Sequence, residues 1–139
     1  MSKSKSYALL AAAVLLLPLP VIAQSTGAAP QSSRQMLMAK DLPDLPGKEA
    51  MVYIIEYPPG TNNPPHRHYG HVFLQVLEGQ LNAQVKGGEL VVLNPGSSYY
   101  ESPSDIHVVS RNPSPTTKAK AMIFIIHDKG TPLTTPVKD

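Results

Sequence analysis

From Ala50 onward, short runs rich in apolar and β-branched residues alternate with clusters of turn residues. Pro58-Pro59-Gly60 and Asn94-Pro95-Gly96 are two such clusters. Runs of this kind, bounded by proline, glycine and asparagine, are typical of β-strands joined by tight turns. The pattern predicts strands at residues 51–57, 65–68, 72–77, 81–85, 90–93, 98–101, 106–110 and 121–127.

Many short strands with regularly spaced turns predict an all-β fold, and the residues after Ala50 show no convincing helical period. An antiparallel sandwich or barrel fits such a series, with the jelly roll among the candidates. Side chains of a strand alternate between its two faces, so only part of the apolar residues fill the interior. We expect the core to include Met51, Ile54, Phe73, Val91, Phe124 and Ile126.

The start of the chain has the composition of a secretory signal. Lys3 and Lys5 precede an apolar run at residues 7–17, and the small residue Ala23 offers a cleavage site. The run is shorter than the ~20 residues needed to cross a bilayer, and the chain has no cysteine for lipidation. We therefore expect removal of residues 1–23, export to the periplasm or beyond, and no stable membrane anchoring after cleavage.

The rest of the chain is long enough for one domain and too short for two well-packed ones. Residues 24–47 begin with a stretch rich in alanine, serine and glutamine and continue with Pro43 and Pro46, which predicts a flexible leader and an extended arm. The strand pattern places the β-barrel domain at residues 48–128. Residues 129–139 are then a C-terminal tail, expected to pack loosely.

Charge counts argue against a polyanionic partner. The chain has 12 basic and 10 acidic residues. Two of the basic residues, Lys3 and Lys5, belong to the predicted signal, so the mature chain has 10 basic and 10 acidic residues and no net charge. No basic surface remains to indicate binding of nucleic acid or of an anionic membrane. A small molecule is the expected partner.

Histidines give the first indication of chemistry. Side chains two residues apart on a strand share a face, so His66 and His68 project side by side. His107 lies on a later predicted strand, which a closed barrel can bring close. Three imidazoles can hold a transition-metal ion. Spacing alone leaves a second interpretation open, in which His66 and His68 form a solvated strand end and His107 is unrelated.

The residues around these histidines decide between the two interpretations. Residues 59–68, Pro-Gly-Thr-Asn-Asn-Pro-Pro-His-Arg-His, continue to the ending Val-Leu-Glu-Gly at residues 76–79. This stretch resembles the first motif of the cupin superfamily, in which a glycine, His-x-His, a glutamate and a second glycine follow at fixed spacing. Gly60, His66, His68 and Gly79 occupy the places of the motif.

The second cupin motif is degenerate in this chain. Gly96 and His107 keep the expected separation, but Ser102 and Ser104 replace the proline and inner glycine of the motif. The resemblance implies a double-stranded β-helix, or jelly-roll barrel, with a metal ion bound by His66, His68 and His107. It also implies a cupin type-2 protein, and by analogy a homodimer.

Val72 stands where the motif has its metal-binding glutamate. His71, one residue earlier, is the preferred fourth ligand, and Gln75 or a water molecule are the alternatives. Without a carboxylate, a divalent ion keeps its full charge of +2, which favours an anionic ligand. Nitrogen-rich ligation indicates a transition metal such as zinc, iron, nickel, copper or manganese.

The resemblance implies a metal-dependent enzyme of the dioxygenase, isomerase or lyase type acting on a small molecule. Two alternatives stay open: a non-catalytic module that binds or senses a small ligand, and a structural cupin without metal. The sequence assigns no catalytic residue. Glu101 fits a general base less well than a solvated sheet residue, Asp105 fits a turn cap or an acceptor behind His107, and His127 is expected at the surface or hydrogen-bonded.

Overall fold

The computed structural model describes residues 28–138, and all of its regular elements are strands. The predicted signal peptide, residues 1–23, lies outside this range. No helix able to cross a membrane occurs among the described residues. The strands are β1 (Ser33–Asp41), β2 (Lys48–Tyr57), β3 (Asn62–Asn63), β4 (His66–Arg67), β5 (Gly70–Glu78), β6 (Leu81–Val85), β7 (Val91–Leu93), β8 (Ser98–Glu101), β9 (His107–Arg111), β10 (Ala119–Asp128) and β11 (Thr135–Pro136).

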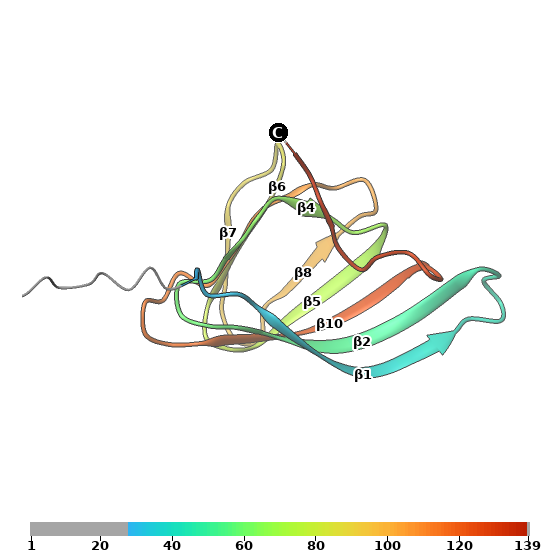
Figure 1. Cartoon of the computed structure of the whole chain (residues 1–139), viewed down its shortest axis with the longest axis horizontal. Helices are drawn as coiled ribbons and strands as arrows, with labels where there is room; N and C mark the ends of the chain where they lie inside the picture. The colour runs from blue at the N-terminus through green and yellow to red at the C-terminus, as the bar shows by residue number, and fades with distance from the viewer. Residues whose placement is uncertain (1–27, 139) are drawn as a thin grey trace, which may run out of the picture.

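Two antiparallel sheets face each other across one core (Figure 1). The first has the strand order β1-β2-β10-β5-β8, and the second has the order β11-β4-β9-β6-β7, with β3 paired to β9. Strands distant in sequence are therefore neighbours, as β4 and β9 are. This topology confirms the all-β jelly-roll prediction, and it brings the segments that carry His66 and His107 side by side.

The eight predicted strands all occur, with ends that differ by a few residues. Three further strands lie in segments that the sequence left irregular. Strand β1 pairs with β2 from Ser33 to Asp41, so the expected flexible leader and arm at residues 24–47 include an ordered edge strand. Strand β11 pairs with β4, so the tail at residues 129–139 is also part of the fold. Backbone pairing, rather than apolar periodicity, orders both segments.

The sequence analysis assigned the wrong face of two strands, β5 and β10, to the core. Phe73 is 46 % exposed and Phe124 is 37 % exposed, whereas their neighbours Val72, Leu74, Ile123 and Ile125 are buried. Because side chains alternate, a shift of one residue exchanges the whole set. Val91 is exposed and Met51, Ile54 and Ile126 are only partly buried, so the core consists of Tyr53, Ile55, Tyr57, Val72, Leu74, Val76, Leu81, Ala83, Leu93, Ala119, Ala121, Ile123 and Ile125.

Gly79 ends the first motif because no other residue fits its position. Its φ is +70°, and a Cβ atom would lie 2.5 Å from the Lys118 carbonyl oxygen and 2.8 Å from the Ala119 Cα. We expect Gly79→Ala to lower the free energy of unfolding by roughly 3 kcal/mol, from backbone strain plus the clash. Urea denaturation measures this. Gly87→Ala is the control, because Gly87 has φ +82° but open space around it, and an equal loss in both variants would contradict the role of the clash.

Candidate metal centre

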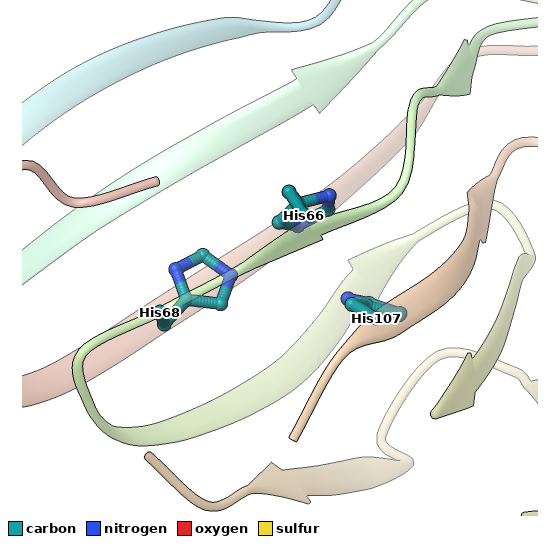
Figure 2. A group of neighbouring side chains, drawn as sticks. All are labelled: His66, His68 and His107. Atoms are coloured by element: carbon teal, nitrogen blue, oxygen red, sulfur yellow. The ribbon is translucent and has the colours of Figure 1, made fainter. Parts of the chain in front are cut away.

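Three histidines converge between the two sheets. His66 on β4 pairs directly with His107 on β9, and His68 follows two residues after His66. Figure 2 shows the three rings turned toward one another from these two segments. The His66 ring centroid lies 5.0 Å from that of His68 and 5.1 Å from that of His107. One ring nitrogen from each lies within 4.8 Å of the others, a separation that a small movement of the rings can close around one ion.

Backbone carbonyls fix the orientation of two of the rings. His66 Nδ1 lies 2.8 Å from the Pro64 carbonyl oxygen, and His68 Nδ1 contacts the Leu133 carbonyl oxygen. A carbonyl only accepts hydrogen bonds, so Nδ1 carries the proton in both rings and leaves Nε2 with a free lone pair. A hydrogen bond donated by the ring nitrogen that does not bind the ion is characteristic of histidines that ligate metals. Leu133 belongs to the tail, which therefore contributes to the site.

His107 gives an independent test of whether a metal would fit. Its side chain is buried, and its Nε2 has no hydrogen-bond partner among residues 28–138. A buried polar atom without a partner costs free energy. A metal ion bound by imidazole nitrogens would satisfy such an atom, so the donor set of His66, His68 and His107 fits a transition metal.

Both His66 and His68 are neutral at physiological pH. Burial lowers the pKa of His66 to about 4, against the opposing effect of the Pro64 carbonyl. Burial also lowers the pKa of His68, although Glu101 and the Leu133 carbonyl counteract it. Only the neutral imidazole ligates a metal, so the site needs no deprotonation of these two rings at pH 7.

Glu101 is the residue that the sequence interpretation misplaced. It was expected in solvent, but it is 3 % exposed and its Oε2 lies 3.1 Å from His107 Nδ1 and 3.9 Å from His68 Nε2. Burial alone would raise the pKa of Glu101, and the neighbouring His107 and His68 outweigh it and lower the pKa. The premise of the sequence argument, that no carboxylate lies at this centre, is therefore wrong.

The cluster lines a pocket of about 180 Å³. Its walls combine aliphatic side chains with polar ones, and this combination is typical of small-molecule sites. The polar members besides the histidines and Glu101 include Arg34, Tyr53, Tyr57, Asn63 and Ser110. A pocket of this size admits a molecule of a few non-hydrogen atoms next to the three imidazoles.

The sequence model of the Cupin domain matches residues 53–126, more than half of the chain. The chain belongs to the cupin family. A comparison with curated protein sequences gave no match. The matched range contains the three clustered histidines and Glu101, so the candidate centre of this cupin lies within the family domain.

Solved structures support the cupin fold. A cupin 2 conserved barrel domain protein from Rhodopseudomonas palustris superimposes with a TM-score of 0.60 at 17 % identity, covering 83 % of this chain and 73 % of that one. Oxalate oxidase in complex with the substrate analogue glycolate gives a TM-score of 0.56 at 21 % identity, with coverages of 76 % and 55 %.

A third structure, the DMSP lyase DddQ from Ruegeria pomeroyi DSS-3, gives a TM-score of 0.57 at 19 % identity. The match covers 63 % of this chain and 43 % of the lyase, so this cupin spans less than half of that protein. At identities this low, the three superpositions show a shared fold alone.

The structure does not bring His71, the preferred fourth ligand, to this centre. It is exposed on the opposite face of β5, where its Nδ1 lies 2.8 Å from the Tyr100 hydroxyl. Gln75 shares that outer face, whereas Val72 points inward. No bulge reverses the alternation between Val72 and Gln75, so β5 offers the centre an apolar side chain at the motif position.

Other residues singled out in the sequence have structural roles. Asp105 Oδ2 accepts a hydrogen bond from the Ser102 backbone amide at 2.7 Å, so it caps the turn before His107. His127 is 1 % exposed rather than at the surface, with its Nδ1 3.0 Å from Thr131 Oγ1 and its Nε2 3.6 Å from Glu49 Oε1. It lies outside the cluster.

Arg34 is a pocket residue that the sequence interpretation missed. It belongs to β1, within the segment at residues 24–47 that was expected to be a flexible leader and an extended arm, and its guanidinium carbon lies 5.9 Å from the centre of the Tyr53 ring. Its side chain also donates a hydrogen bond to Thr134 of the tail. Residues 33–41 form blocks of polar and apolar residues rather than an alternating series, so periodicity gave no signal for this strand.

Proposed function

We propose that this protein is an exported cupin that holds one divalent transition-metal ion on His66, His68 and His107 and acts with it on a small molecule. One observation carries the proposal: imidazoles from two strands distant in sequence meet in a buried pocket with ring nitrogens within 4.8 Å. A bound ion would supply a Lewis acid that polarises a substrate oxygen. The Pro64 and Leu133 carbonyls hold the His66 and His68 rings in place for it.

The polar wall of the pocket supports an anionic substrate. Arg34 lines the pocket and keeps its positive charge at any physiological pH. Tyr53 beneath it stays protonated, because burial raises the pKa of this phenol to about 12, so its hydroxyl can donate a hydrogen bond. Arg34 therefore attracts the charged group of a small carboxylate or similar anion, while Ile55 and Leu74 contact its apolar part.

The reaction class in this proposal is oxygenation, isomerisation or elimination. Structural neighbours include a lyase and an oxidase, and a polar pocket beside a metal centre suits each of these reactions. The second candidate is a module that binds a small ligand without turnover. The observation in its favour is Val72, which replaces the carboxylate of the first motif.

Elemental analysis of protein purified without an affinity tag tests the metal part of the proposal. We expect about one transition-metal ion per chain, and absence of stoichiometric metal would favour a structural cupin. Incubation of the metal-loaded protein with a panel of small carboxylates then tests turnover. Ligand binding that requires the metal but proceeds without turnover would establish the binding module.

Export and pairing complete the proposal. The charged and then apolar start of the chain supports export with cleavage after Ala23, and N-terminal sequencing of the protein from its native compartment tests it. The exposed edge of β1 supports a homodimer, because unpaired strand edges favour association. Light scattering at several protein concentrations measures the oligomeric state.

A further inference from the structure

Each ring of the histidine cluster has a hydrogen-bond acceptor at its Nδ1 atom. For His66 and His68 that acceptor is a backbone carbonyl oxygen. For His107 it is a side chain, because Glu101 Oε2 lies at a hydrogen-bond distance of 3.1 Å from Nδ1. The same oxygen lies 3.9 Å from His68 Nε2, which is beyond hydrogen-bond distance. Within the cluster, Glu101 is therefore the partner of His107 alone.

The contact with Glu101 decides which nitrogen of His107 is available to an ion. A carboxylate oxygen accepts hydrogen bonds, so Nδ1 of His107 carries the proton and Nε2 keeps a lone pair. That Nε2 atom is buried, and it has no hydrogen-bond partner in the part of the chain that the structure describes. His66 and His68 leave the same atom free. All three imidazoles are thus fixed with Nδ1 occupied and Nε2 available.

Strand β8 holds the His107 ring from two directions. Glu101 is 3 % exposed and contacts the edge of the ring. Tyr99 lies two residues earlier on the same face of β8. Its ring stacks on that of His107, with 6.2 Å between the ring centroids and an interplanar angle of 29°. The hydrogen bond fixes the rotation of the imidazole and the stacking fixes its plane.

We infer that Glu101 is a positioning residue of the metal centre: it accepts the Nδ1 proton of His107 and thereby directs Nε2 of that ring to the ion, without binding the ion itself. The inference rests on the proposed metal binding at His66, His68 and His107. The protein ligands are then three imidazoles, and the apolar Val72 adds none. Further coordination positions stay open to a ligand from the pocket, as in catalytic rather than structural metal sites.

Replacement of the carboxylate tests the inference. Glu101→Met removes the acceptor and keeps the length of the side chain, whereas Glu101→Gln keeps an acceptor oxygen. Glu49→Gln is the matched control, because Glu49 is also buried beside a histidine but lies outside the cluster. Long-range nitrogen–proton NMR of the metal-free proteins identifies the protonated nitrogen of each imidazole, and His107→Gln assigns the signals of that ring. Calorimetric titration with Zn²⁺ gives the Kd, and circular dichroism checks the fold.

We expect the Nδ1–H tautomer for His107 in the wild type. Glu101→Met should shift that ring toward the Nε2–H tautomer and raise the Kd for Zn²⁺ by ~10-fold to 100-fold, the range typical of partners behind a ligand. Glu101→Gln should keep the Nδ1–H tautomer and recover most of the affinity, because its amide oxygen can accept the same hydrogen bond. Glu49→Gln should match the wild type in both measurements.

Three results would overturn the inference: an Nε2–H tautomer of His107 in the wild type, an unchanged Kd in Glu101→Met, or a raised Kd with an unchanged tautomer in that variant. The third would show that Glu101 stabilises the fold rather than orienting the ring. Should Glu101→Met not fold, the wild-type tautomer decides. The tautomer is measured without metal, so these results are distinct from failure of the proposed function, in which the wild type itself binds no metal.

Discussion

The His66→Ala, His68→Ala double variant is expected to lose stoichiometric metal binding, with an increase in Kd of at least about 1,000-fold. Both side chains project from one segment into the cluster, and the contacts of their Nδ1 atoms with the Pro64 and Leu133 carbonyls leave the Nε2 atoms for the ion. The variant removes two of three imidazoles, and a transition metal held by His107 alone binds weakly. Elemental analysis and calorimetric titration with Zn²⁺ measure the effect.

His71→Ala is the control for this double variant. His71 is a histidine of the same sequence cluster, but it lies on the outer face of β5 against Tyr100. We expect its Kd to stay within about twofold of the wild type, since it contributes no ligand. Retention of one metal ion per chain by the double variant, or a large loss in His71→Ala, would contradict the site described above.

Metal-free protein is expected to lose stability on acidification from about pH 6.5 to pH 4. Burial lowers the pKa of His66 to about 4 from its ordinary value of 6.5. In this pH range the unfolded chain binds a proton at His66 that the folded chain does not bind, so the free energy of unfolding rises with pH and falls as acid is added. His68, whose pKa is also lowered by burial, changes stability in the same direction.

The contribution of His66 is on the order of 2 to 3 kcal/mol, since one pKa unit corresponds to about 1.4 kcal/mol. Urea denaturation at pH 7 and pH 4.5, in the presence of a chelator, measures it. His66→Gln removes the titration and should flatten the pH dependence, whatever its effect on stability at pH 7. Equal pH dependence in the wild type and His66→Gln would show that burial of this imidazole does not control the acid sensitivity.

Strand positions were predictable because turn chemistry and β-propensity are local properties of the sequence. The face of each strand was harder, because β5 carries apolar residues in both phases around Phe73. Polar neighbours of the same parity contained the answer: His71 and Gln75 share the face of Phe73, and that face is exposed. The predicted fourth ligand His71 was on the wrong face for the same reason.

Glu101 could not be placed from its own sequence neighbourhood. A carboxylate in an antiparallel strand is ordinarily solvated, because burial of a charge without partners is costly. Only the pairing of β8 with β5 and the approach of His68 and His107 supply the surroundings in which this glutamate is buried. Arg34 and Leu133 depend in the same way on the pairing of β1 and β11.

The sequence by itself determined an all-β cupin domain, the positions of its main strands along the chain, and the three histidines of the candidate centre. These features depend on local spacing and on the side-chain period of a strand. The tertiary structure decided which faces are buried, that the tail and the first strand line the pocket, and that Glu101 rather than His71 lies at the cluster. These depend on which strands pair and in which register, and pairing between distant segments is set by packing of the whole barrel.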